Sequence, residues 1–121
     1  MKLLIVDDEP ALRQVLAEQI RYQAAETMNP RDELIVREAA SAQEGLERVW
    51  QAEAVLCDGL DGEWVKVWAV ASKRGAHFVL YSGDPAQVNQ ANLIGVRAFS
   101  KPFGTQEAIA ALLDSPAARA A

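Results

Sequence analysis

Three aspartates, one serine and one lysine of this sequence have side chains that suit chemistry on a phosphate group. Asp7 and Asp8 are adjacent, whereas Asp58, Ser82 and Lys101 are spread over the rest of the chain. Paired carboxylates are hard oxygen ligands for Mg²⁺, which also takes water and phosphate oxygens. A third carboxylate can act as a nucleophile and form an acyl phosphate, and a lysine and a hydroxyl can hold the remaining phosphate oxygens. Together these types suit metal-assisted phosphoryl transfer.

The elements that must position these residues are short apolar segments that alternate with helical stretches. Three of the segments are nearly unbroken apolar runs, as expected for parallel strands that are covered on both faces. We therefore predict an α/β fold with a small, open, doubly wound sheet. The predicted strands are Leu3–Val6, Leu34–Glu38, Ala54–Cys57, Phe78–Ser82 and Val96–Ser100.

The candidate residues all stand at the ends of predicted strands. Asp7 and Asp8 follow the first strand, Asp58 follows the third, Ser82 ends the fourth and Lys101 follows the fifth. Ligands of open parallel sheets bind outside the carboxyl ends of the strands, near the point where the strand order reverses. We therefore expect the five side chains to converge on one pocket, where three carboxylates without a metal repel one another. Binding of Mg²⁺ should accordingly stabilise the domain.

Five helices are predicted from residues that favour helix starts and from the spacing of apolar residues. Pro10 opens the first, Ser41 caps the second with Glu44 completing a capping box, and Asp84 with Pro85 opens the fourth. The third runs from about Glu63 to Lys73, and Thr105 opens the fifth. The residues expected to face inward from the first two helices are Leu12, Val15, Leu16, Ile20, Leu46, Val49 and Trp50.

Composition restricts the class of protein. The 121 residues, half of them hydrophobic, fit one compact domain, which we place at 1–114, with 115–121 as a disordered tail or the start of a linker. The single cysteine, Cys57, excludes an internal disulfide and suits a reducing compartment. A net charge of −5 argues against nucleic-acid binding by this domain. No apolar run approaches a membrane span, so a cytoplasmic location without membrane attachment is expected.

Each candidate residue also has a structural alternative. Aspartates that follow strands commonly cap helices, and residues 8–10 (DEP) also suit a helix start. Residues 82–85 (SGDP) likewise suit a turn in which Asp84 is the N-cap, and a lone lysine such as Lys101 is usually a solvated surface group. It is the coincidence of five such residues at the ends of four strands that favours a functional site.

Several segments resemble the receiver domain of two-component response regulators, and the resemblance covers essentially the whole chain. The segments are residues 3–10 (LLIVDDEP), 38–46 (EAASAQEGL), the strand before Asp58, 80–83 (LYSG) and 99–103 (FSKPF). The resemblance implies a flavodoxin-like five-stranded sheet of order 2-1-3-4-5. Its most specific parts are the Asp-Asp-Glu-Pro start and the Lys-Pro-Phe near the end, which stand at about the separation expected for the family.

The resemblance assigns roles to individual residues. It implies that Asp58 is the phosphoacceptor and that Asp7 and Asp8 hold Mg²⁺ together with Asp58 and the backbone carbonyl of Leu60. Ser82 matches the hydroxyl of the switch, and Lys101 matches the phosphate-binding lysine. It further implies that Phe99 is the aromatic switch residue and that the Lys101–Pro102 peptide bond is cis.

The implied partners follow from the same resemblance. A histidine kinase or a histidine phosphotransfer protein would phosphorylate Asp58, and the surface of the fourth helix, fifth strand and fifth helix would change. A downstream protein, an output domain missing from this chain or a second copy would bind there. Such a domain catalyses only its own phosphorylation and dephosphorylation, so it is not expected to be an enzyme in the usual sense.

One segment departs from the family pattern, and two other function classes compete with this interpretation. Residues 58–62 (DGLDG) lack the usual Met-Pro after the acceptor, so a short loop, flexible at Gly59 and Gly62, is expected there. The short loop argues for the alternative of a pseudo-receiver that is never phosphorylated and acts as a constitutive interaction module, whereas the presence of all five site residues argues against it. A remote alternative is a haloacid-dehalogenase-like phosphatase, but its Asp-x-Asp spacing is missing from Asp7-Asp8-Glu9.

Overall fold

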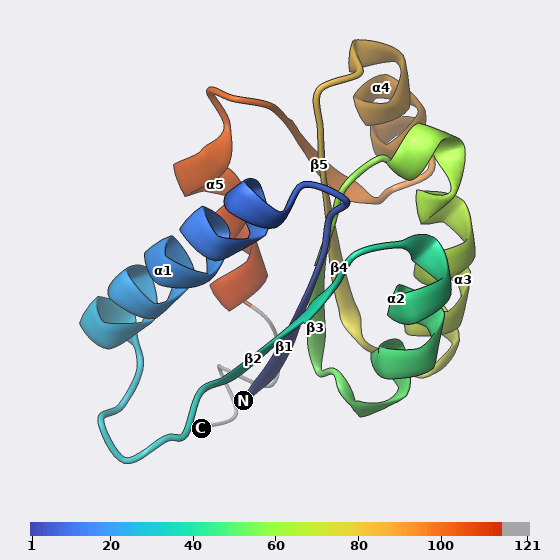
Figure 1. Cartoon of the computed structure of the whole chain (residues 1–121). Coiled ribbons are helices and arrows are strands. Elements are labelled where there is room, and N and C mark those ends of the chain that lie inside the picture. Colours follow the sequence, from blue (N-terminus) through green and yellow to red (C-terminus); the bar gives the residue numbers. More distant parts are fainter. Residues whose placement is uncertain (115–121) are drawn as a thin grey trace.

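A single parallel sheet forms the centre of the computed structural model, which describes residues 1–114; the predicted tail at 115–121 lies outside the described residues. The five strands run in the order β2-β1-β3-β4-β5 (Figure 1). The predicted α/β class and strand order are thus confirmed, and the order is that of Rossmann-like and flavodoxin-like folds. The strands are β1 (Lys2–Val6), β2 (Ile35–Ala39), β3 (Ala54–Cys57), β4 (His77–Ser82) and β5 (Arg97–Ser100).

Helices cover both faces of the sheet (Figure 1). Helices α1 and α5 pack on one face, and α2, α3 and α4 pack on the other. Two short 3-10 turns, η1 and η2, connect α2 to β3 and β3 to α3. The elements are α1 (Pro10–Thr27), α2 (Ala42–Arg48), η1 (Val49–Gln51), η2 (Leu60–Gly62), α3 (Trp64–Lys73), α4 (Pro85–Leu93) and α5 (Thr105–Leu113).

Two cores, one on each face, hold the sheet between the helices. Alternate residues of β1 divide between them, so that Leu4 and Val6 face α2 and α3 while Leu3 and Ile5 face α1 and α5. All of β3 is buried, because it is the middle strand and is covered on both faces. Burial of apolar surface on both faces therefore holds the sheet in place, and the candidate residues stand at the ends of its strands.

Local signals account for several helix starts. Pro10 is in the first turn of α1, and Ser41 Oγ accepts a hydrogen bond from the Glu44 amide at 3.2 Å. The Glu44 carboxylate accepts one from the Ala40 amide at 2.9 Å, one residue before the position of an ideal capping box. Asp84 caps α4 through the Ala86 amide, as one of the structural alternatives predicted.

Two residues predicted to face inward are exposed instead. Val15 has an exposed fraction of 45%, because the buried side of α1 is centred on Leu16 and Ile20. Trp50 has an exposed fraction of 60% because α2 ends before it and the tighter turn η1 carries its side chain outward.

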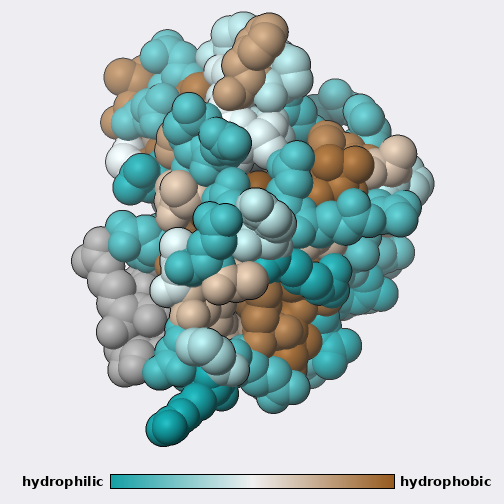
Figure 2. Space-filling model, turned by 90° about the vertical axis from the view of Figure 1, so that its left-hand side faces the viewer, coloured by the Kyte–Doolittle hydropathy of each residue, from teal (hydrophilic) through white to brown (hydrophobic). Residues whose placement is uncertain are grey.

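The surface on the side of α1 and α5 is mostly hydrophilic, with separate hydrophobic patches (Figure 2). Among residues 1–114, no helix has both the length and the apolar character that a membrane crossing requires.

Candidate functional site

The candidate residues gather at the carboxyl edge of the sheet, as the sequence predicted. Sheet-like hydrogen bonds continue just past the strand ends, so the backbone of the site is held in place. The amide of Asp58 donates to the Val6 carbonyl at 2.7 Å, and that of Asp7 donates to the Ala39 carbonyl at 3.0 Å. The amide of Lys101 donates to the Ser82 carbonyl at 2.9 Å. The chain has little freedom to separate these residues.

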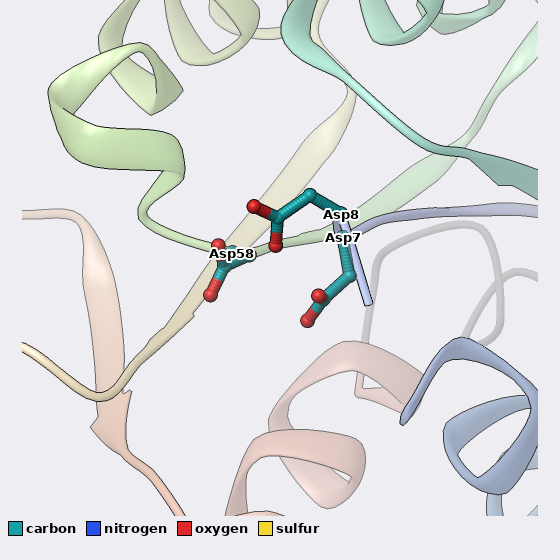
Figure 3. A group of neighbouring side chains, drawn as sticks. All are labelled: Asp7, Asp8 and Asp58. Carbon is teal, nitrogen blue, oxygen red and sulfur yellow. The ribbon is translucent and has the colours of Figure 1, made fainter. Parts of the chain in front are cut away.

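Three carboxylates form an acidic cluster at this edge (Figure 3). Asp7, Asp8 and Asp58 each place one carboxylate oxygen within 4.8 Å of those of the other two. Asp7 is buried, Asp58 is half-buried and Asp8 is exposed, so the cluster opens to solvent on the side of Asp8. A small hollow of about 190 Å³, lined in part by Asp8 and Leu60, lies beside it.

The ammonium of Lys101 joins two of these carboxylates. Its Nζ lies 2.9 Å from Asp7 Oδ2 and 2.5 Å from Asp58 Oδ1. Lys101 is thus not a solvated surface group, and the structural alternative for it is wrong. With Asp8 included, three carboxylates face one ammonium, which leaves an excess of negative charge that a divalent cation can neutralise.

Burial and hydrogen bonding act in opposite directions on the pKa values of Asp7 and Lys101. Burial raises the pKa of the Asp7 carboxyl, and hydrogen bonds from Lys101 and from the Glu9 amide offset only part of that effect. Burial alone lowers the pKa of the Lys101 ammonium, but the hydrogen bonds to Asp58 and Asp7 outweigh it, so the pKa of Lys101 is raised above 10.5. Lys101 therefore stays charged at neutral pH. Asp7 gives up its proton less readily than an ordinary aspartate does.

The raised pKa of Lys101 predicts how its stabilising effect depends on pH. A cation whose pKa is higher in the folded state stabilises that state fully below its unfolded pKa of 10.5 and loses this effect as the pH rises through the folded pKa. The difference in free energy of unfolding between wild type and Lys101→Met should thus be constant from neutral pH to about pH 10 and shrink above it. Urea titrations at several pH values measure this; a difference that grows at alkaline pH would contradict it.

The ligand chemistry of the cluster fits Mg²⁺. Its ligands are hard carboxylate oxygens, and the exposed Asp8 leaves room for the waters that Mg²⁺ retains. Asp7, Asp8 and Asp58 would hold the ion. The Leu60 carbonyl remains a prediction, although the Leu60 amide donates to Asp58 Oδ2 at 3.1 Å and so lies at the site.

We predict that Asp8→Asn removes stabilisation by Mg²⁺ without destabilising the metal-free protein. Asp8 is exposed and lies next to two other carboxylates, so its charge is unfavourable until a cation binds. Thermal unfolding with and without millimolar Mg²⁺ should show a rise in Tm for wild type and a much smaller rise for the variant. Glu18→Gln, an exposed acidic residue of α1, serves as the charge-matched control. An equal rise in Tm for wild type and Asp8→Asn would exclude Asp8 as a ligand.

Ser82 is buried at the end of β4, with an exposed fraction of 2%. Its hydroxyl donates to Gln87 Oε1 at 2.8 Å and accepts a hydrogen bond from the Asp84 amide at 3.0 Å. Gln87 was not singled out in the sequence, because it lies inside α4 and not at a strand end. A Gln five residues after the serine carries no recognisable signal by itself.

The segment after Asp58, expected to be a flexible loop, forms the defined turn η2. Gly59 is buried with φ −63°, so its backbone does not need a glycine; a side chain there would meet Gln87 Oε1 and Ser82 Oγ, and the Gln87 side chain would have to move. Leu60 and Asp61 have positive φ values of 50° and 54°, and Gly62 has φ 93°. The missing Met-Pro is thus accommodated by left-handed backbone, which is costly at Leu60.

The residues around Lys101 complete the rim of the site. The Lys101–Pro102 peptide bond is cis, as the resemblance implied. The Tyr81 hydroxyl donates a hydrogen bond to the Pro102 carbonyl at 3.2 Å and also contacts Thr105 Oγ1. Phe99 is half-buried against the core under α1 and α5, with the Arg97 guanidinium 5.7 Å from its ring centre. Its role as a switch stays a prediction.

Other reactive or aromatic residues have structural roles. Cys57 is fully buried, and burial raises the pKa of its thiol well above the usual value, with the negative charge of Asp58 adding to the effect. Trp64 is fully buried and stacks on Phe78 with ring centres 6.2 Å apart. Cys57 and Trp64 thus both belong to the hydrophobic core on the side of α2 and α3.

Comparisons with known proteins define the fold and nothing finer. No family model and no curated protein matches this chain. A de novo designed protein described as a Rossmann 2x3 fold, whose solution NMR structure has been determined, is similar with a TM-score of 0.60 and 14% sequence identity. The similarity covers 89% of this chain and 82% of the designed one. This chain therefore has a Rossmann-like α/β fold, and any function must be argued from the site itself.

Proposed function

We propose that this domain accepts a phosphoryl group on Asp58 and thereby switches a surface that binds another protein. The observation that carries the proposal is the contact of Lys101 Nζ with both Asp58 Oδ1 and Asp7 Oδ2, beside the carboxylate of Asp8. A half-buried ammonium on a half-buried carboxylate holds that carboxylate in one position and supplies positive charge where phosphate oxygens must lie.

The residues have distinct roles in the transfer. An oxygen of the Asp58 carboxylate attacks phosphorus, a new oxygen–phosphorus bond forms, and the bond between phosphorus and the donor's leaving group breaks in line. Lys101 then moves from the carboxylate to a phosphoryl oxygen, and Ser82 donates its hydrogen bond to another. Bound Mg²⁺ would offset the repulsion between the Asp58 carboxylate and the incoming anion.

The proposed donor is a histidine kinase or a histidine phosphotransfer protein, and the proposed readout involves Ser82 and Phe99. Movement of Ser82 toward the phosphate would change the packing of Phe99 and the surface of α4, β5 and α5. Leu93 and Ile94 at the end of α4 support a partner surface, because their exposed fractions are 78% and 54%. A downstream protein, an output domain or a second copy would bind there, in the cytoplasm.

The test is a time course with acetyl phosphate and Mg²⁺ in which intact protein mass and released phosphate are both followed. The proposal predicts a gain of one phosphoryl group per chain that needs Mg²⁺ and decays when the donor is removed. Rapid multiple turnover of phosphorylated small molecules without an adduct would favour a phosphatase instead. An unchanged mass in rapidly quenched samples would favour the pseudo-receiver.

A further inference from the structure

The hydroxyl of Ser82 can donate only one hydrogen bond, and in this structure it donates that bond to the side chain of Gln87. We propose that Gln87 is a positioning residue that holds Ser82 in the unphosphorylated state and must release it when Asp58 is phosphorylated. The inference rests on the proposed function and deepens it, because it names the residue that connects the site to α4. The Ser82 hydroxyl donates to Gln87 Oε1 at 2.8 Å.

Within residues 1–114, Gln87 Oε1 is the acceptor that the Ser82 hydroxyl uses. Ser82 has an exposed fraction of 2%, so bulk water does not reach its hydroxyl. The Asp84 amide already donates to the same oxygen at 3.0 Å, which uses one lone pair and leaves the single O–H for one acceptor. A buried hydroxyl without an acceptor is unfavourable, so the bond to Gln87 stabilises the position in which Ser82 is held.

The side-chain amide of Gln87 also lies close to Asp58, the proposed phosphoacceptor. A Cβ built on Gly59, the residue directly after Asp58, would come within 1.8 Å of Gln87 Oε1 and 2.8 Å of Ser82 Oγ. The side chain of Gln87 therefore reaches from α4 to the backbone of Gly59, one residue past Asp58. If a phosphoryl oxygen on Asp58 accepts the hydrogen bond from the Ser82 hydroxyl, Gln87 Oε1 loses it. The two acceptors compete because the hydroxyl has a single O–H to donate.

Release of Gln87 acts directly on α4. Gln87 lies in the first turn of this helix, where its backbone N–H donates to the Asp84 carbonyl at 3.1 Å. Among the residues of α4, only Ala91 is buried, so few apolar contacts oppose a shift of the helix. The exchange of acceptors at Ser82 thus provides a direct connection from the phosphorylation site to the proposed partner surface.

The experiment measures uptake of beryllium fluoride, a phosphoryl mimic, by fluorine NMR in the presence of Mg²⁺. Gln87→Met keeps the length and helix propensity of the side chain but removes the acceptor. Its affinity should be about fivefold higher than that of wild type, the ratio that corresponds to one hydrogen bond of about 1 kcal/mol that no longer has to be broken. Gln90→Met, at an exposed glutamine of the same helix, is the matched control and should behave like wild type.

A double-mutant cycle separates this role from general repacking of α4. In a Ser82→Ala background, Gln87→Met should change the affinity by less than about twofold, because the proton for which the two acceptors compete is gone. A second measurement needs no metal: amide hydrogen exchange in the first turn of α4 should be faster in Gln87→Met than in Gln90→Met.

The outcomes are distinguishable. Equal affinities of wild type and Gln87→Met, or a Gln87 effect that persists without Ser82, would overturn the inference while leaving the proposed function intact. A wild-type protein that takes up no beryllium fluoride would overturn the proposed function, and the inference with it.

Discussion

Asp58→Asn should abolish the phosphoryl adduct and leave the domain folded. The variant has no anionic oxygen to attack phosphorus, so no adduct should form with acetyl phosphate and Mg²⁺ at any time point. Asparagine retains one oxygen, which can accept the hydrogen bond of Lys101 or that of the Leu60 amide but not both, because these donors bind different oxygens of Asp58. It also removes one of three neighbouring carboxylates, so the free energy of unfolding should stay within about 1 kcal/mol of wild type. Intact-protein mass and urea unfolding measure the two effects.

Asp61→Asn is the matched control for this variant. Asp61 is an exposed aspartate of the adjoining turn, and its positive φ of 54° is a conformation that asparagine also adopts readily. It should be phosphorylated like wild type. An adduct on Asp58→Asn, or its loss in both variants, would contradict the assignment of Asp58 as the acceptor.

Lys101→Met should slow phosphorylation strongly and also destabilise the metal-free protein. Loss of a group that stabilises transition-state charge typically costs about 100-fold or more in rate, and Lys101 is the cation in contact with the acceptor. Without it, the buried Asp7 carboxylate loses its ion pair, which should lower the free energy of unfolding by about 2 kcal/mol. Mg²⁺ should restore much of this stability, because it supplies positive charge to the same carboxylates.

Lys66→Met provides the comparison, since Lys66 forms an exposed ion pair with Glu63 on the surface at α3. Its effect on stability should be below about 0.5 kcal/mol, and its phosphorylation rate should equal that of wild type. If Lys101→Met were as stable and as fast as Lys66→Met, the ion pairs of Lys101 would have no part in the site.

The fold was predictable because parallel strands buried on both faces leave continuous apolar runs in the sequence. Residues 54–57 (AVLC) show this most clearly, and β3 has the predicted bounds. Strand ends were less predictable. His77 joins β4 although its side chain is polar, because its amide is held by the Glu53 carbonyl at 3.0 Å. Such pairing depends on neighbouring strands and leaves no local pattern.

The candidate site was predictable only where its residues follow strands. Asp7, Asp58 and Lys101 lie at strand ends, so the topology alone brings them together. Gln87 reaches the site from inside a helix, and its closeness to Gly59 depends on the packing of α4, so neither was visible in the sequence. The cis bond before Pro102 was expected from family resemblance and not from local residues.

The role of Asp58 is tested most directly by locating the phosphoryl adduct. Wild-type protein treated with acetyl phosphate and Mg²⁺ is reduced with borohydride, which converts an aspartyl phosphate to homoserine, and the peptides are sequenced by mass spectrometry. A phosphoacceptor role of Asp58 predicts homoserine at position 58 alone, and none when Mg²⁺ is omitted. Homoserine at Asp7, Asp8 or Asp61, or at no aspartate while the protein remains folded, would contradict the claim that Asp58 is a phosphoacceptor.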